Sequence, residues 1–198
     1  MLALRVAARG EGCVPYPFVE SPNVTRSTGR RIDVVVIHTM EIDERPDAAE
    51  ICARWFASTA SEVSAHYCVD AGTVIQCVRE KDIGWHARGG NTSSLGVELA
   101  GFARQSEREW DDDYSRAVLG RAATLVADIC LRRRIPVRWL AADDLLAGRR
   151  GLTGHAEVSR AYRRSDHWDP GPGFPVERFV DAVRAAQASH PTRVRQAR

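Results

Sequence analysis

The stretch DVVVIH, residues 33–38, decides how the rest of the chain is interpreted. Between Asp33 and His38 it holds an unbroken run of β-branched residues, which predicts a strand that is buried on both faces. Such strands are typical of sheets that carry helices on both sides. The stretch ends in a histidine, and side chains at the ends of strands often belong to functional sites.

Outward from this stretch, strands alternate with helices towards the C-terminus. Asp47 is a good N-cap for a helical run over 48–58, and the turn at 71–73 predicts a hairpin between strands over 64–70 and 74–79. The further expected elements are a glycine-rich loop over 84–92, a strand over 94–100, a long helix over 113–134, a short buried strand over 137–140, an ordered loop over 151–173 and a final helix over 175–188. The mixture predicts the fold class, a single α/β domain with a mixed central β-sheet flanked by helices.

The length and composition of the chain suit one ordinary folded domain. It has 198 residues, of which 44% are hydrophobic and 27% are charged. We expect an irregular segment over 1–31, a folded domain over 32–188 and a basic, frayed tail over 189–198. The formal net charge of +2 is too mild to favour nucleic acid as a partner.

Neither a membrane span nor a signal peptide is evident in the sequence. No stretch approaches the roughly 20 apolar residues of a membrane-spanning helix. Residues 1–8 are apolar apart from one arginine, but they are too short for a complete signal peptide, which needs an apolar core of roughly 7–15 residues and a cleavage site. We therefore expect synthesis in the cytoplasm without a signal peptide.

The cysteines do not form a recognisable metal site. The chain has five of them, and none belongs to a C-x-x-C pair, which argues against a cysteine zinc site. The odd count without close spacing indicates core thiols in a reduced compartment. Cys68 and Cys77 flank the predicted hairpin and could face each other, so a disulfide between them is the alternative.

Two histidines and one aspartate stand out as possible ligands of a metal. His38 ends a strand, His155 follows a glycine in T-G-H, and Asp169 opens the turn sequence D-P-G-P. Each alone is more often structural, and the alternative for Asp169 is a turn-capping role. Together, however, two imidazoles and one carboxylate supply the three nitrogen and oxygen ligands of a catalytic zinc site, which keeps a fourth position open.

Four segments carry a resemblance to a known family. They are VVIHTM, SAHYCVDAGTVIQCV, GWHARGGNTSSLGVELAG and TGHAEVSRAYRRSDHWDPGPGFP. In this order they resemble the zinc N-acetylmuramoyl-L-alanine amidases of the type 2 family, which includes phage lysins, bacterial wall-recycling amidases and peptidoglycan recognition proteins. The resemblance covers about residues 33–180, and it implies that 32–188 is an amidase catalytic domain.

The resemblance implies a role for each candidate of the catalytic centre. His38, His155 and Asp169 match the zinc ligands, and Asp166 is the competing candidate for the third. Glu98 matches the acidic residue that acts as general base. It points away from the apolar face of its predicted strand, and a solvated glutamate is the alternative.

His167 takes a place where many relatives have lysine. The resemblance implies that it stabilises the oxyanion of the tetrahedral intermediate. Ala65 stands where other members use a tyrosine, so activity would depend on Glu98 and His167. The implied substrate-binding residues are His66, Trp85, His86, Asn91 and Trp168. A structural role for His66 and a packing role for Trp168 stay open as alternatives.

The resemblance therefore implies a Zn²⁺ hydrolase that cleaves the amide bond between N-acetylmuramic acid and L-alanine. Its partner would be peptidoglycan or a muropeptide, and we expect a monomer. The expected role is that of a phage endolysin, made in the cytoplasm and released to the cell wall by a holin. A cytoplasmic muropeptide-recycling amidase, a non-catalytic peptidoglycan-binding module and a structural phage tail protein are the alternatives.

Overall fold

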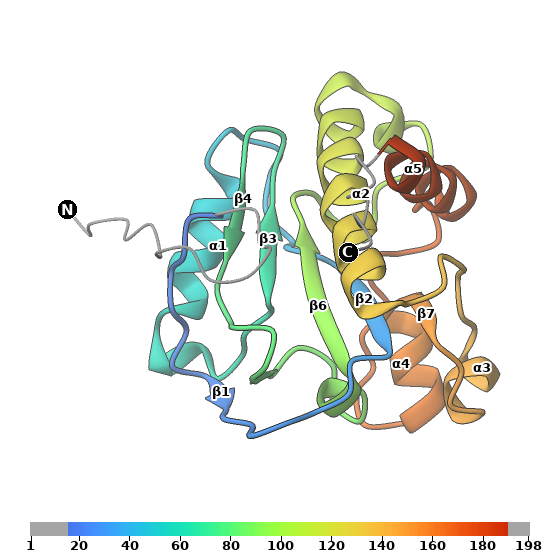
Figure 1. Ribbon diagram of the computed structural model, residues 1–198. Helices are drawn as coiled ribbons and strands as arrows, with labels where there is room; N and C mark the ends of the chain where they lie inside the picture. Colours follow the sequence, from blue (N-terminus) through green and yellow to red (C-terminus); the bar gives the residue numbers. More distant parts are fainter. Residues whose placement is uncertain (1–15, 190–198) are drawn as a thin grey trace, which may run out of the picture.

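A five-stranded sheet in the order β4-β3-β6-β2-β7 forms the centre of the structure, a computed structural model that describes residues 16–189 (Figure 1). The strand β4 runs antiparallel to β3, and the other neighbours in the sheet are parallel. The predicted mixed sheet is therefore confirmed. The strands are β2 (Val34–Thr39), β3 (Tyr67–Val69), β4 (Val74–Gln76), β6 (Ser94–Leu99) and β7 (Gly151–Gly154).

The central strand β2 is the one that the run of β-branched residues predicts. All six of its residues are buried, because β6 and β7 pair with its two edges and helices cover its two faces. Its register with β6 sets His38 directly beside Glu98. Neighbours in register on parallel strands share one face of the sheet, so these two side chains project to the same side.

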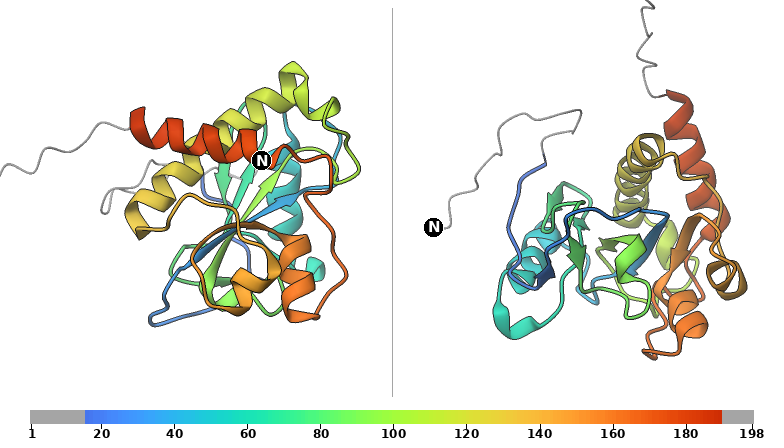
Figure 2. Two further views of the ribbon diagram at one scale, coloured as in Figure 1. Left: turned by 90° about the vertical axis from the view of Figure 1, so that its right-hand side faces the viewer. Right: turned by 60° about the horizontal axis from the view of Figure 1, so that its bottom comes forward.

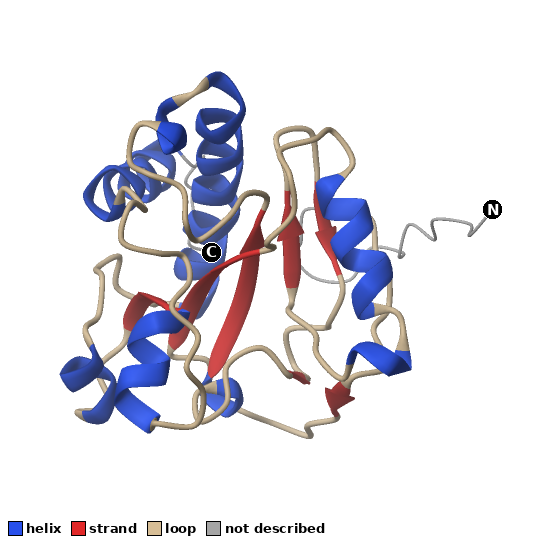
Figure 3. Cartoon of the chain, turned by 180° about the vertical axis from the view of Figure 1, so that it is seen from behind, coloured by secondary structure: helices blue, strands red, loops and turns tan. Residues whose placement is uncertain are grey.

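Helices cover both faces of the sheet, as Figure 2 shows in side view. The long helix α2 (Asp113–Arg133) lies on one face, and α5 (Val176–Ser189) packs against it. On the other face, α1 (Ala48–Phe56) packs on β3 and β4, and α4 (His155–Tyr162) packs on β2 and β7 (Figure 3). The candidate site residues gather on this second face, between α1 and α4.

Smaller elements surround this frame. The strands β1 (Val24–Thr25) and β5 (Ile83–Gly84) form a separate two-stranded sheet, and the helix α3 (Ala142–Leu146) packs on α4. Short 3₁₀ helices are η1 (Thr59–Ser61), η2 (Asn91–Ser93) and η3 (Glu109–Asp111). The rest of the segment 16–31 is irregular.

Two predicted elements differ from the structure. The expected strand at 137–140 is a single bridge between Trp139 and Leu152, because this stretch pairs with β7 at one point only. The expected loop at 151–173 begins instead with β7 and α4. A Cβ at Gly151 would lie 2.6 Å from the carbonyl oxygen of Arg138, so this strand position needs a glycine. The β-branched residue that would normally indicate a strand is therefore absent.

The predicted cap of α1 is also different in detail. Asp47 is the N-cap by position, but its side chain makes no capping hydrogen bond and instead pairs with Arg45. The backbone N–H of Ala49 donates to the buried carboxylate of Asp70 at 3.0 Å. A residue distant in sequence therefore satisfies the start of this helix, which a local pattern does not reveal.

The described cysteines are buried thiols, and the disulfide alternative is wrong. The Sγ atoms of Cys68 and Cys77 lie 3.8 Å apart, and both residues are free. Cys13 lies outside the described residues. So do residues 1–8, on which the prediction of no signal peptide rests, and residues 190–198 of the tail predicted over 189–198. Within residues 16–189, no helix is long and apolar enough to cross a membrane.

Candidate metal centre and active site

The candidate site lies at the carboxyl ends of the parallel strands. His38 is the fifth residue of β2, Glu98 lies beside it on β6, and His155 follows β7 directly as the first residue of α4. Asp169 comes from the loop that follows α4. Side chains from the carboxyl ends of parallel strands converge at one edge of a sheet, which is where α/β proteins commonly bind ligands.

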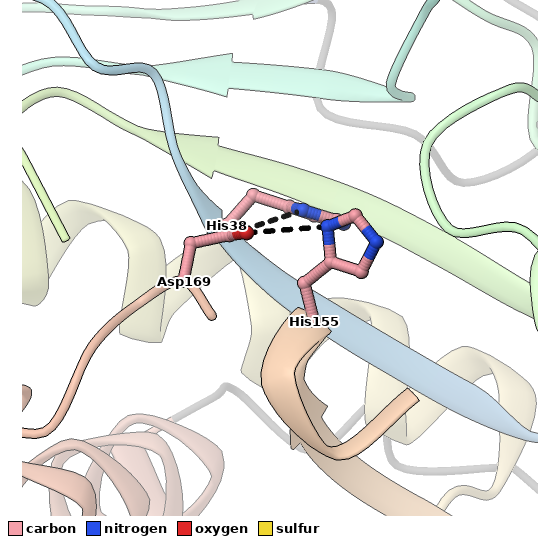
Figure 4. A group of neighbouring side chains, drawn as sticks. All are labelled: His38, His155 and Asp169. Carbon is pink, nitrogen blue, oxygen red and sulfur yellow. Dashed lines mark hydrogen bonds and ion pairs between the residues drawn. The ribbon is translucent and has the colours of Figure 1, made fainter. Parts of the chain in front are cut away.

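His38, His155 and Asp169 form one buried cluster (Figure 4). The two carboxylate oxygens of Asp169 lie 2.9 Å from Nδ1 of His38 and 3.2 Å from Nδ1 of His155. One potential ligand atom from each residue lies within 4.8 Å of the others. Two imidazole nitrogens and a carboxylate oxygen so close together fit the donor set of a catalytic metal ion. Asp166, the competing candidate, is exposed and lies outside this cluster.

Two glycines allow the loop that carries Asp169 to reach the histidines. A Cβ on Gly154 would lie 2.6 Å from Cδ of Pro170. Gly171 adopts a φ of 87°, and a Cβ there would lie 1.8 Å from the carbonyl oxygen of Ala103. Side chains at these positions would push the loop away from the sheet, so the motifs T-G-H and D-P-G-P fit together through their glycines.

The electrostatics of the cluster suit a metal ion. Burial disfavours the ionised form of Asp169, but hydrogen bonds to His155 and His38 outweigh this effect and hold its pKa well below the usual range. Burial also lowers the pKa of His155, in spite of the opposing bond to Asp169. A carboxylate next to a neutral imidazole is the protonation state in which these residues bind a metal.

Glu98 is a buried carboxyl group with no hydrogen-bonding or ion-pairing side chain against it among residues 16–189. It is 9% exposed, and that exposed part faces the cavity above the cluster. Burial raises its pKa well above the ordinary value, and Cys52, Asp169 and Glu41 add to the rise. The alternative of a solvated strand glutamate is therefore wrong.

A cavity of about 260 Å³ opens over the cluster. Four of the predicted site residues besides the cluster and Glu98 line it, namely Trp85, His86, His167 and Trp168. The ring of His167 stacks on that of His155 at 4.4 Å, and its Nδ1 lies 3.6 Å from Oδ1 of Asp169. Trp168 is 53% exposed, so it borders the cavity and is not packed in the core.

The other predicted substrate residues divide into two kinds. His86 reaches the cluster, since its Nδ1 lies 3.1 Å from Nε2 of His38. Asn91 does not line the cavity; its Oδ1 accepts the backbone N–H groups of His86 and Ala87 and so shapes the loop. A Cβ on Gly96 would lie 2.6 Å from Cγ of His86, so the glycine of S-L-G-V-E makes room for this imidazole.

His66 is placed for a structural role rather than for substrate contact. It has no exposed surface, Gly96 donates its backbone N–H to Nδ1 at 3.0 Å, and Nε2 lies 3.1 Å from the carbonyl oxygen of Asp82. Burial, with the nearby charge of Arg30, lowers its pKa to about 3. The substrate-binding prediction for His66 is corrected by this placement, and the structural alternative fits.

Sequence reasoning missed several residues of the site. The cavity is also lined by Thr39, Glu41, Phe56, Val63, Ser64 and Ala103. Ser165 was missed as well; its Oγ lies 3.4 Å from Nε2 of His155. Thr39 directly follows the candidate ligand His38 in H-T, which is a signal. Ser64 and Ser165 lie within the segments that carry the family resemblance, which is a weaker signal. The others lie outside these segments, and only the fold brings them to the site.

The fold and the site define an α/β protein with a candidate metal centre and a buried carboxyl group beside it. The chain belongs to the N-acetylmuramoyl-L-alanine amidase family, since the model of that family matches residues 28–172. It is accordingly an enzyme of the amidase class, and its His-His-Asp cluster could hold a metal ion.

A relative of known name agrees with this assignment, and solved structures share the fold. N-acetylmuramoyl-L-alanine amidase A of Achromobacter lyticus is 27% identical over 165 residues, which cover 79% of this chain and 86% of the relative. The hydrolase AmiA of Staphylococcus aureus shares the fold with a TM-score of 0.67 and 16% identity, covering 86% of this chain and 82% of AmiA. A mutant endolysin from Bacillus subtilis has a TM-score of 0.57 and 18% identity, covering 85% and 99%.

Proposed function

We propose that this amidase is a zinc enzyme that hydrolyses the bond between the lactyl group of N-acetylmuramic acid and L-alanine in peptidoglycan. The observation that carries the proposal is the position of Glu98. It lies in register beside His38 and lines the cavity over the cluster, and its carboxyl group has no hydrogen-bond partner within residues 16–189. A binding module needs no such group, whereas a hydrolase needs a base near its metal.

The donor set supports zinc as the metal. His38, His155 and Asp169 would hold it with two nitrogens and one oxygen, the ligand types of catalytic zinc sites. Ser165 would keep the ring of His155 in place from the far side. When bound, zinc would supply a Lewis acid that polarises the amide carbonyl and lowers the pKa of water to about 7.

The side chains around the cluster support the remaining roles. Glu98 would accept a proton from the attacking water and pass it to the leaving amine, since its carboxyl group lines the cavity beside the cluster. His167 would donate an N–H to the developing oxyanion. The aromatic rings of Trp85 and Trp168 border the cavity and would contact the sugar or the peptide.

The test is amine release from purified peptidoglycan by metal-free and zinc-loaded protein. We expect activity to disappear with a chelator, to return with stoichiometric zinc, and to be absent in His155→Ala at all zinc concentrations. Asp166→Asn is the matched control, since Asp166 is exposed and lies outside the cluster. Full activity of metal-free protein, or of His155→Ala, would contradict the proposal.

For the biological role we propose a phage endolysin that acts as a monomer on the intact wall after holin-dependent release. The fold likeness to endolysins and the open cavity with exposed tryptophans are compatible with a polymeric substrate. The measurement is turnover on intact cell walls against turnover on soluble anhydro-muropeptides. Faster cleavage of walls is expected, and cleavage of the soluble fragments alone would favour the recycling amidase.

A further inference from the structure

A second cleft lies at the other end of the loop that carries Trp85 and His86. It has a volume of about 640 Å³. Its walls come from two segments, the loop before β6 and the end of α4, which lie side by side at the lower edge of the molecule in Figures 1 and 3. The lining residues are Arg88, Gly89, Asn91, Thr92, Tyr162 and Arg164.

Close packing fixes the two walls of this cleft relative to each other. Gly89 has a φ of 94°, and a Cβ there would lie 2.5 Å from Cβ of Tyr162. A Cβ on the next residue, Gly90, would lie 3.2 Å from a methyl group of Val158. The loop therefore rests directly on α4, so Arg88 comes to the cleft from one segment and Arg164 from the other.

The polar side chains that line the cleft can all donate hydrogen bonds. Within residues 16–189, neither Arg88 nor Arg164 has a carboxylate or any other side-chain partner, and no acidic residue lines the cleft. Asn91 uses its Oδ1 for two backbone N–H groups, which leaves its NH₂ group unpaired. The hydroxyl groups of Thr92 and Tyr162 add further donors. Two guanidinium groups with neighbouring amide and hydroxyl donors match a carboxylate or a phosphate.

We propose that this cleft binds an oxyanion, a carboxylate or a phosphate, on the wall polymer whose amide bond is cleaved at the metal centre. The anion chemistry stands on the cleft alone, whereas the identity of the polymer rests on the proposed function. The helix α4 has His155 at its start and Tyr162 at its end, so the cleft lies roughly 10 Å along the helix from the cluster, at 1.5 Å per residue. This distance is within the span of a few units of an extended polymer.

The first test measures anion binding directly. Inorganic phosphate and acetate are titrated into the protein, and the amide resonances of residues 88–92 are followed by NMR. The variant Arg88→Gln/Arg164→Gln should bind the preferred anion at least about tenfold more weakly, since it loses two charge-assisted hydrogen-bond donors. The matched control is Arg108→Gln/Arg134→Gln, which removes two exposed arginines without side-chain partners elsewhere in the described chain. Equal binding by the two double variants would overturn the proposal.

The second test identifies the source of the anion. KM is compared on walls stripped of phosphodiester-linked polymers and on walls whose stem-peptide carboxylates are amidated. The treatment that removes the recognised anion should raise the KM of the wild type about tenfold and leave that of Arg88→Gln/Arg164→Gln unaffected. If neither treatment changes the wild-type KM, the cleft does not bind the wall and the proposal fails.

The two proposals can fail separately. Anion binding is therefore also measured in His155→Ala, which lacks a metal ligand but keeps both arginines. Anion binding in a protein that never cleaves peptidoglycan would sink only the proposed function. Normal cleavage with no effect of the two arginines would sink only the oxyanion cleft.

Discussion

Two buried glutamates, Glu80 and Glu98, differ in almost every respect that decides what a carboxylate does. Glu80 accepts hydrogen bonds from the hydroxyl of Tyr67 at 2.9 Å, from Arg132 at 2.8 and 3.0 Å, and from Arg133 at 3.0 Å. Burial opposes its ionisation, but these bonds prevail and lower its pKa to about 2. Glu98, with no such bonds, has a pKa shifted in the opposite direction.

The difference separates a structural carboxylate from a reactive one. Each oxygen of Glu80 is occupied by donors of its own chain, so this group is already in its most stable form and has nothing left to offer a substrate. Glu98 is buried to a similar degree but faces a cavity beside a candidate metal centre. An unsatisfied buried polar group costs free energy, and such costs are retained mainly at functional sites.

The largest expected effect is that of Glu98→Gln. If Glu98 is the general base, kcat should fall by roughly 10²- to 10⁴-fold, the contribution typical of acid–base catalysis. The free energy of unfolding at pH 7 should be equal or higher, because glutamine removes a carboxyl group whose ionisation the fold disfavours. Steady-state turnover measures kcat, and denaturant unfolding measures the free energy of unfolding.

Glu41→Gln is the matched control for this substitution. Glu41 lines the same cavity, but its Oε1 accepts hydrogen bonds from Thr39 and from the backbone of Ala103, which a glutamine oxygen also accepts. We expect a much smaller loss of kcat. Equal losses in the two variants would mean that the cavity needs carboxylates in general and not a base at position 98.

Glu80→Gln should act on stability instead. The pKa is 4.5 in the unfolded chain and about 2 in the fold, so ionisation of Glu80 stabilises the fold above pH 4.5. This contribution is about 3 kcal/mol at pH 7, from 1.36 kcal/mol per pKa unit, and it is lost as the pH falls from 4.5 towards 2. Urea unfolding at pH 7, 5 and 3.5 gives the free energy of unfolding of variant and wild type. The difference between the two should become smaller below pH 4.5. A difference that is constant over this range would show that the Arg132 and Arg133 bonds are not its source.

The sequence revealed the elements whose signal is local. The run Val34 to Ile37 was enough to predict the central strand, and the motifs around His38, His155 and Asp169 predicted the members of the cluster. The strand β7 could not be predicted, because its glycines carry no strand preference and only pairing with β2 extends it.

Burial and contacts between distant segments were beyond the sequence. His66 and His86 are both histidines near predicted strands and turns, so the sequence does not distinguish them. Only His86 lines the cavity, whereas His66 is fully buried. Phe56 lines the site because α1 packs on β3 and β4 and its last residue reaches the cavity. Tertiary packing brings such residues to the site, whereas the local sequence pattern around them is that of an ordinary helix.

The smallest expected effect is that of substituting His167, whose side chain is exposed, unlike the buried side chains of Glu80 and Glu98. This imidazole stacks on His155 but is 62% exposed at its side chain, so water weakens its field far more than that of a buried donor. His167→Ala should lower kcat about tenfold, less than the loss of a buried oxyanion donor. His167→Lys should retain most of the activity, since an ammonium group supplies the same hydrogen bond.

Zinc content should stay at one equivalent in both variants, whereas Asp169→Asn should lose the metal. A His167→Lys enzyme as slow as His167→Ala would show instead that the flat ring stacked on His155 is what the site requires, and the donor role would then be wrong.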